Sequence, residues 1–460
     1  MKKGRKMIKL AGAIVLVGLL AINWNLNFNT STVSAAGEYL VNGEMWNYGL
    51  GDAIGFNENT YTTITTTSKN NNWRHGSVSG NGELGFIESC DPNEDVMIIN
   101  NTKIVSDTTS IYHTPEIAGS LDRIRTGAIK KTEYPWLDII NAYAVSKFGA
   151  SSWGTTWPRP YQPAAQYRMK NNDYTSAGAY NRYTNYETGE VGLQWKNADK
   201  SCEWDKRSFA SRSDNVIVTS VKAGANFNIT LSIDAINQMQ GTPDSTITAS
   251  YFVESDSNGY ALGMVGKYGI RNRVGTLNPE ETLLAHGGWG TATRIIAPGA
   301  TITQGEISGR PTLTFTGTNS IMLITKADLQ VNGCNTLDDV RTKCYNRLRD
   351  DIDGVVAKYK AAGQFTYEDI LAPHAAIHGK MFNTVRLNLC NTDEEKADRL
   401  LSNSQLIAKQ NSQTTFNKAY MERAYYNGRF ALICASGYQS TRLGGIWTGM
   451  WNPDWSGDFT

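Results

Sequence analysis

The sequence has almost no excess of charge of either sign. Lysine and arginine number 44 against 43 aspartates and glutamates among 460 residues, and charged residues make up only 19% of the chain. Beyond the N-terminal segment, no long run of basic residues occurs. Because proteins that bind nucleic acids concentrate positive charge on one face, this composition argues against a nucleic acid as the partner.

Cysteine is sparse and lacks metal-binding spacing. No CxxC pair occurs, so the sequence does not support a zinc ribbon. The cysteines are also too few for a disulfide-stabilised scaffold. Two of them fall on the apolar faces of predicted helices, which favours buried free thiols at Cys344 and Cys434. The six cysteines are Cys90, Cys202, Cys334, Cys344, Cys390 and Cys434.

Metal and phosphate motifs are equally weak. His374 and His378 lie four residues apart in PHAAIHGK, but no third histidine or acidic residue accompanies them, so packed or capping histidines are favoured. The glycine-rich stretch SVSGNGELGFI, residues 77–87, lacks the lysine and the following helix of a phosphate loop and predicts a turn into a strand. The sequence therefore predicts no metal and no cofactor.

The one long apolar run lies at the N-terminus. LAGAIVLVGLLAI follows the basic segment MKKGRKMIK, and small residues near Ala35 and Ala36 offer a cleavage site. The run is short for a membrane span, and an uncleaved anchor would need a longer one. Residues 1–36 are therefore predicted to be a signal peptide. We expect a secreted protein that meets a membrane only during export.

Residues 37–332 carry the pattern of a β domain. Short runs rich in β-branched residues alternate with glycine, asparagine and aspartate, and long insertions intervene, notably at 141–180. Many short strands with turn signals predict a large sandwich. The clearest runs are DVMIIN, NVIVTSVKAG, NFNITLSI, TITASYFV and SIMLITKADLQV.

The pattern changes at Thr336, where helices begin. Thr336 and Asp339 form a capping-box pattern, and apolar residues then recur at helical spacing to about residue 361. The stretch MFNTVRLNL alternates apolar residues from Val385 to Leu389 and predicts a strand. Residues 333–390 are therefore assigned to a linker helix and strand.

Two further helices are predicted in residues 391–460. Thr392 and Glu395 form a second capping box that opens a helix to about Lys409, and another helix covers roughly 415–436. Two such helices cannot enclose a core of their own. We therefore expect these residues to be the start of an all-α domain that looks unfinished at Thr460.

A loop rich in aromatic residues follows the last predicted helix. In GGIWTGMWNPDWSGDFT, residues 444–460, a large aromatic residue recurs at every fourth position, but Gly449, Pro453 and Gly457 oppose a helix. Flat aromatic faces on a loop suit the apolar face of a sugar ring, and nearby polar groups suit its hydroxyls. The predicted carbohydrate-binding residues are Trp447, Trp451, Asn452, Trp455 and Asp458.

The order of several blocks resembles glycoside hydrolase family 95, the α-L-fucosidase and α-L-galactosidase family. SVSGNGELGFI followed by DVMIINNTKIV resembles its opening strands, and residues 181–224 resemble its hairpin series. His374 with MFNTVRLNL resembles the block before its barrel. YMERAYYNGRFALICASG and the aromatic loop resemble its first barrel helix and the loop after it.

This resemblance implies a β-supersandwich, a helical linker and the first helices of an incomplete (α/α)6 barrel. It also implies inverting, exo-acting hydrolysis of α-L-fucosides or related bonds, with the catalytic groups expected beyond Thr460. The family's acidic motif after the second strand is replaced here by Asn100, Asn101 and Thr102, and Thr460 stands where fucosidases place a histidine, so a sister specificity is also open. The alternatives are a non-catalytic carbohydrate-binding protein and a glycoside phosphorylase of the related clan.

Overall fold

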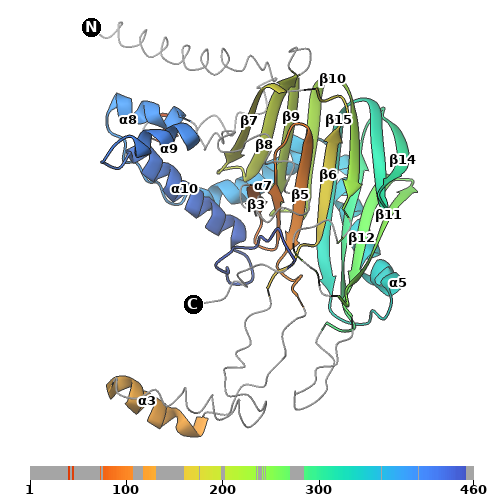
Figure 1. Cartoon of the computed structure of the whole chain (residues 1–460), viewed down its shortest axis with the longest axis horizontal. Coiled ribbons are helices and arrows are strands. Elements are labelled where there is room, and N and C mark those ends of the chain that lie inside the picture. Colours follow the sequence, from red (N-terminus) through yellow and green to blue (C-terminus); the bar gives the residue numbers. More distant parts are fainter. Residues whose placement is uncertain are drawn as a thin grey trace.

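A computed structural model gives the structure of most of the chain after residue 72 (Figure 1). It describes residues 40–41, 44–45, 73, 76–106, 118–130, 160–175, 177–197, 203–234, 236, 241, 243, 245–269, 284–363, 365–401 and 403–451. The predicted signal peptide and residues 141–159 of the insertion at 141–180 lie outside these residues. No helix within the described ranges has the length and apolarity needed to cross a membrane.

Strands make up most of the described residues between 77 and 330. The longer ones are β3 Ser77–Gly80, β4 Leu84–Glu88, β5 Glu94–Asn101, β6 Ala165–Asn171, β7 Ala177–Asn185, β8 Glu190–Asn197, β9 Glu203–Ala210, β10 Ile217–Ile233, β11 Thr248–Asp256, β12 Gly259–Lys267, β13 Gly288–Ile296, β14 Thr301–Ile307 and β15 Arg310–Gln330. A separate hairpin joins β1 Leu40–Val41 and β2 Glu44–Met45. All of the described strand pairs are antiparallel, as the alternating sequence pattern predicts.

Two long strands, β10 and β15, divide this strand network into two sheets. The first half of β10 pairs with β9 and with the second half of β15, whereas its second half pairs with β6 and the first half of β15. A register shift between Lys222 and Phe227 marks the bend. Sheet I therefore runs β7-β8-β9-β10-β15-β13-β12-β11, and sheet II runs β3-β4-β5-β6-β10-β15-β14. The predicted large sandwich is thus built from two sheets that share two strands.

The main core lies between the two sheets. Leu84 and Phe86 of sheet II and Trp204 and Trp289 of sheet I belong to one buried cluster. The indoles of Trp195 and Trp204 stack with ring centroids 4.9 Å apart. Aromatic rings of this size bury a large apolar area, so this cluster supplies much of the hydrophobic stabilisation of the β domain.

A helical layer covers the outer face of sheet I. It comprises α5 Leu337–Val340, a π-helical turn at Arg341–Tyr345 and α6 Asn346–Ala361. The predicted stripe of apolar residues, from Val340 to Tyr359, packs against Val218 and Ile324 of the sheet. Because both faces of sheet I are covered, its strands form continuous apolar runs such as NVIVTSV. The predicted capping box of Thr336 and Asp339 is confirmed.

The strand predicted around residues 385–389 is wrong. Helix α7, Tyr367–Phe382, takes up the first two residues of MFNTVRLNL, and residues 385–389 pair with no strand in the described structure. Their backbone groups bond to side chains of a later helix instead: Leu387 N donates to the Tyr426 hydroxyl, and Cys390 N donates to Glu422 at 3.0 Å. A pattern of alternating apolar residues cannot reveal these distant partners.

Three helices follow α7 (Figure 1). The capping box of Thr392 and Glu395 is confirmed, but the helix that it opens is shorter than predicted. It breaks into α8 Asp393–Ala397, a 3-10 turn at Asp398–Leu400 and α9 Asn403–Asn411, and Arg399 of the 3-10 turn pairs with the buried Glu422. The last predicted helix is confirmed as α10, Lys418–Ala435. The structure is thus a large antiparallel β domain followed by helices that are consistent with the start of an (α/α)6 barrel.

The described cysteines are buried free thiols, as predicted for Cys344 and Cys434. Cys202 lies outside the described residues.

A buried charged cluster joins the two sheets. The Lys206 ammonium of sheet I pairs with the carboxylates of Glu88 and Asp95 of sheet II, and all three side chains are at most 4% exposed. Ser208 Oγ donates a further hydrogen bond to Glu88 at 3.1 Å, and Ser89 Oγ donates one to Asp95 at 2.6 Å. Burial, and the Asp95 charge to a lesser degree, raise the pKa of Glu88 to about 7 against the opposing effect of Lys206.

This cluster predicts a small effect on the free energy of unfolding for one substitution and a large loss for another. The folded pKa of Glu88 lies above its unfolded value of 4.5. The contribution of Glu88 to the free energy of unfolding is therefore complete below pH 4.5 and declines as the pH rises through about 7. Glu88→Gln should therefore keep the stability within about 1 kcal/mol and flatten its decline between pH 5 and 8. Lys206→Met should cost about 3–5 kcal/mol, because it leaves buried carboxylates unpaired. Urea unfolding at several pH values measures both, and equal losses would contradict this account.

Candidate functional site

The predicted carbohydrate-binding loop begins where α10 ends against the β domain. The apolar face of α10 packs Tyr426 and Phe430 against Tyr186 of the β7–β8 turn. At the end of the helix, Gly82 N of the β3–β4 turn donates to Cys434 O at 2.8 Å. Arg212 donates to Ile433 O and, at 3.1 Å, to Asn81 O. The last carbonyls of α10 are therefore capped by the β domain rather than by solvent.

Glycines make this close approach possible. Gly82 has a φ of +91°, and a Cβ atom there would overlap the carbonyl oxygen of Ser436. A Cβ atom at Gly80 would lie 2.7 Å from Cys434 O, and one at Gly85 would lie 2.6 Å from Ile446 Cδ1. The glycine-rich stretch 77–87 is a turn into a strand, as predicted, but its glycines serve a second purpose. They clear a surface on which the helix end and the loop lie.

The loop then runs along sheet II and is fixed by three hydrogen bonds from side chains. Trp447 Nε1 donates to Ser79 O at 3.0 Å, and Asn100 Nδ2 donates to Thr448 O at 2.9 Å. Trp451 Nε1 donates to Ile236 O at 3.1 Å. The loop is therefore attached to the β domain at successive points before residue 452.

The two described tryptophans face the β domain. Trp447 is half-buried and packs against Ile87, Val96 and Ile98 on the outer face of sheet II. Trp451 is 1% exposed and belongs to the core between the sheets. The indole of Trp451 therefore has no free face for a sugar ring in this structure, and both tryptophans anchor the loop. Three of the predicted binding residues, Asn452, Trp455 and Asp458, lie outside the described residues, and their role stays a prediction.

Two buried histidines hold α7 against the β domain, close to the end of α10. We call this region, where α7 and the end of α10 meet the β domain, the junction. His374 and His378 are both 0% exposed, as expected for packed residues. His374 Nε2 contacts Thr188 O at 2.9 Å, and its Nδ1 accepts from Arg212 N at 3.0 Å. His378 Nε2 contacts Tyr186 O at 3.1 Å. The bond to Nδ1 requires a neutral His374 that donates through Nε2, and His378 also donates through Nε2.

The electrostatics of the junction keep these histidines neutral. Burial lowers the pKa of His374 to about 3 and that of His378 to about 4, and the positive charge of Arg212 acts in the same direction on both. Burial also lowers the pKa of Arg212. Arg212 is cationic at neutral pH and lies at the negative end of the α10 dipole, which favours a positive charge there.

The described part of the loop after α10 offers no carboxylate that could act as a catalytic acid or base. Residues 437–451 contain no aspartate or glutamate. Glu83 of the β3–β4 turn pairs with Lys103 at 2.8 Å. Within the described ranges, no three histidine, cysteine or acidic side chains come together in a way that could hold a metal ion.

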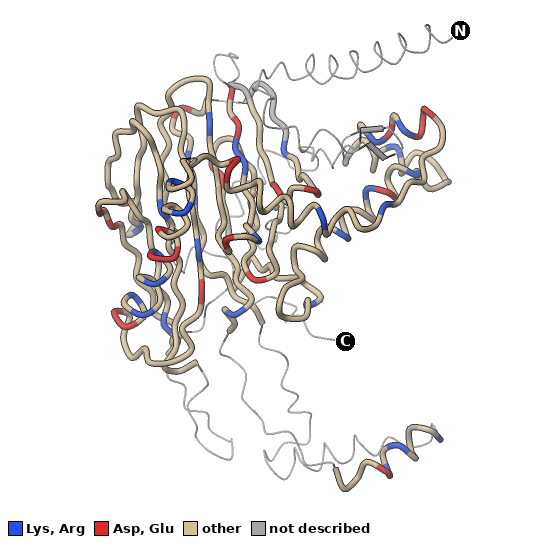
Figure 2. The backbone as a smooth tube through the Cα atoms, turned by 180° about the vertical axis from the view of Figure 1, so that it is seen from behind, with Lys and Arg blue, Asp and Glu red and all other residues tan. Residues whose placement is uncertain are grey.

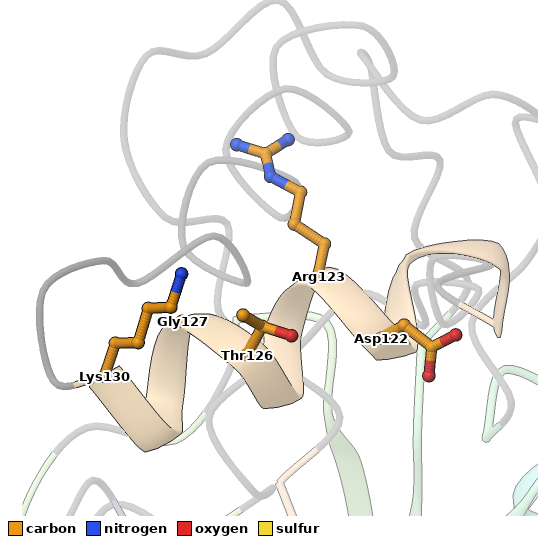
Figure 3. A pocket seen from close by; sticks show the side chains of 5 residues that line it. All are labelled: Asp122, Arg123, Thr126, Gly127 and Lys130. Carbon is orange, nitrogen blue, oxygen red and sulfur yellow. The ribbon is translucent and has the colours of Figure 1, made fainter.

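A pocket lies away from the junction, beside helix α3, Leu121–Lys130 (Figure 3). Its volume is about 320 Å³, and its described lining residues all come from this one helix: Asp122, Arg123, Thr126, Gly127 and Lys130. Figure 1 shows α3 well away from the junction. Acidic and basic residues are interspersed along the described backbone in Figure 2, in keeping with the balanced composition.

Sequence reasoning missed several residues of the junction. Thr366 and Asp369 form a capping box that opens α7, and the same S/T-x-x-E-type spacing that identified Thr336 could have found it. The three closely spaced glycines in SGNGELG were a signal of close backbone approach. No local signal indicates that Arg212 reaches the end of a helix more than 200 residues later.

Comparison with known families gives matches to two parts of the chain. Residues 366–460 match the glycosyl hydrolase family 95 catalytic domain, and residues 64–280 match the N-terminal domain of glycosyl hydrolase family 65. A search of curated proteins gave no match.

Three solved structures resemble parts of the chain at low identity. A candidate kojibiose phosphorylase from the human microbiome is 11% identical over 80% of this chain and 41% of its own, with a TM-score of 0.42. A bacterial glucoamylase complexed with acarbose is 12% identical over 57% and 32%, with a TM-score of 0.29. The family GH92 α-mannosidase from Bacteroides thetaiotaomicron is 8% identical over 53% and 28%, with a TM-score of 0.20. This chain spans less than half the length of each of these proteins.

The contact at Gly82 predicts a large and specific effect of one methyl group. Gly82→Ala should destabilise the protein by roughly 1–3 kcal/mol from backbone strain, with a further loss from overlap with Ser436. Gly299→Ala is the matched control, since Gly299 also has a positive φ, of +72°, but open space around its Cβ position. Urea unfolding of the two variants separates the two effects, because the control loses stability only through backbone strain, whereas Gly82→Ala also suffers the overlap with Ser436. Equal losses would show that the helix end does not press on this turn.

The histidine pair predicts a loss of stability in mild acid. The folded pKa values, about 3 and about 4, lie below the ordinary histidine value of 6.5, so the unfolded chain binds protons first as the pH falls. The contribution of the neutral histidines is complete above pH 6.5 and is lost as the pH falls toward 4. His378→Gln should reduce the slope of unfolding free energy against pH between 6.5 and 4. An unchanged slope would mean that His378 does not titrate on unfolding.

Proposed function

Because residues 366–460 match the glycosyl hydrolase family 95 catalytic domain, we propose that this chain is part of a secreted glycoside hydrolase. It acts by exo-cleavage with inversion on α-L-fucosides or related glycosidic bonds of oligo- or polysaccharides. The basic and apolar N-terminal residues support secretion. The β domain and the helices after it support the same class of enzyme.

The observation that carries this proposal is the attachment of the aromatic loop to the β domain. Hydrogen bonds from Asn100, Trp447 and Trp451 fix the loop as far as residue 451. The residues that follow therefore leave from a fixed point. A binding loop needs such support, because a site held in place before the ligand arrives loses less entropy on binding.

In this proposal the loop residues have two different roles. Trp447 and Trp451 act as anchors, since their indoles pack on the β domain. Asn452, Trp455 and Asp458 contact the sugar. An inverting glycosidase also needs an acid and a base about 6.5–9.5 Å apart, and a segment without carboxylates between residues 437 and 451 cannot supply either of them.

The proposal is tested by activity and binding together. The reading frame that contains this chain, with any sequence that follows codon 460, is expressed and assayed on aryl α-L-fucosides and α-L-galactosides. We expect sugar release, with the anomer of the first product inverted when followed by NMR. Release with retention would contradict the mechanism. Binding without release would favour a carbohydrate-binding protein, and phosphate-dependent release would favour a phosphorylase.

The loop assignment predicts a selective effect of Trp455. Trp455→Ala should weaken binding of the sugar by roughly 1–3 kcal/mol if its indole is a buried stacking platform. Tyr438→Ala is the control, because Tyr438 is fully exposed and lies in the same segment. Titration calorimetry of the two variants gives the comparison. Equal affinities in two folded variants would remove Trp455 from the binding site.

A further inference from the structure

A small cavity lies between the two sheets, next to the buried charged cluster. Sheet I contributes Trp195, Trp204 and Lys206 to its lining, and sheet II contributes Asp95 and Asn171. The stretch between β4 and β5 adds Asp91. The cavity has a volume of about 10 Å³, which is close to the smallest space that holds one water molecule.

Two of the lining residues each carry a buried hydrogen-bond donor that has no acceptor among the described residues. These donors are Trp195 Nε1 and Asn171 Nδ2. Trp195 is 4% exposed and Asn171 is 5% exposed, so bulk water does not satisfy either group. The other polar atom of Asn171 is occupied, because its Oδ1 accepts from Asp173 N at 3.1 Å. Buried donors without an acceptor are rare because leaving them unpaired is costly.

The chemistry of the lining limits what can satisfy these donors. A cation has no lone pair to offer two N–H groups, and an anion would be repelled by the carboxylates of Asp91 and Asp95. The volume excludes any larger organic molecule. The ligand must therefore be small and neutral, and it must accept hydrogen bonds from nitrogen while donating to carboxylates.

We propose that this cavity is a binding site for one ordered water molecule that links the two sheets. The water accepts hydrogen bonds from Trp195 Nε1 of sheet I and Asn171 Nδ2 of sheet II. Its own hydrogens face the carboxylates of Asp91 and Asp95. It thereby extends the polar connection made by Lys206 toward the edge of the sandwich, and it does so independently of the proposed glycosidase activity.

The test replaces the indole N–H without changing the shape of the ring. Trp195 is substituted by 3-benzothienylalanine, whose sulfur cannot donate a hydrogen bond. If the water is present, the change removes a hydrogen bond and should lower the melting temperature by about 2–4 °C. Without a water, the change removes an unpaired buried donor and should raise the melting temperature. A rise would overturn the proposal.

Trp289 provides the matched control. Its indole is 0% exposed in the same core, and its Nε1 donates to Ala164 O at 2.9 Å. The same replacement at Trp289 therefore calibrates the loss of one buried hydrogen bond together with any effect of the larger sulfur atom. We expect falls of similar size at the two positions.

A crystal structure at high resolution gives an independent check. We expect a density peak within about 2.7–3.2 Å of both Trp195 Nε1 and Asn171 Nδ2. The absence of a peak, with either nitrogen bonded to a protein oxygen instead, would overturn the proposal even if the replaced protein failed to fold.

Discussion

The contact of two backbones, at the β3–β4 turn and at the end of α10, constrains the rest of the structure. Gly82 donates its N–H to Cys434 O, and no side chain fits at that position. Because the contact is made by main-chain atoms, it fixes the direction of the helix axis and the departure of the loop. Arg212 strengthens it by bonding to the carbonyl beside it. A helix that ended in solvent would leave the loop free to move relative to the β domain.

The β domain can hold a helix and a loop because it is rigid in itself. Its two sheets share β10 and β15, so a displacement of one sheet must bend strands that belong to both. The buried ammonium of Lys206 between Glu88 and Asp95 adds a connection that is directional and costly to break. The loop before residue 452 is attached to this body by Asn100, Trp447 and Trp451. The β domain thus acts as the support of the loop, whatever the sugar that the loop meets.

Local signals in the sequence predicted well wherever the partner of a residue lies near it in the chain. The capping boxes at Thr336 and Thr392 join residues three positions apart, and both are present. The strand predicted at 385–389 is absent, and the backbone of Leu387 and Leu389 bonds instead to Tyr426 and Glu422, more than 30 residues later. The regular spacing of aromatic residues likewise could not show that Trp451 turns into the core and bonds to Ile236. A periodic pattern reports which residues are apolar, but not which surface covers them.

The sequence by itself determined that a β-rich domain precedes helices, that helices begin after Thr336 and Thr392, and that an aromatic loop follows the last helix. These features depend on periodicity, capping and turn residues, which act within a few positions. Only the tertiary structure decided that β10 and β15 serve two sheets, that the glycines of residues 77–87 receive the end of α10, and that Arg212 and two histidines close the junction. These outcomes depend on contacts between segments that lie 100 to 400 residues apart, and their energies arise only when the two surfaces meet.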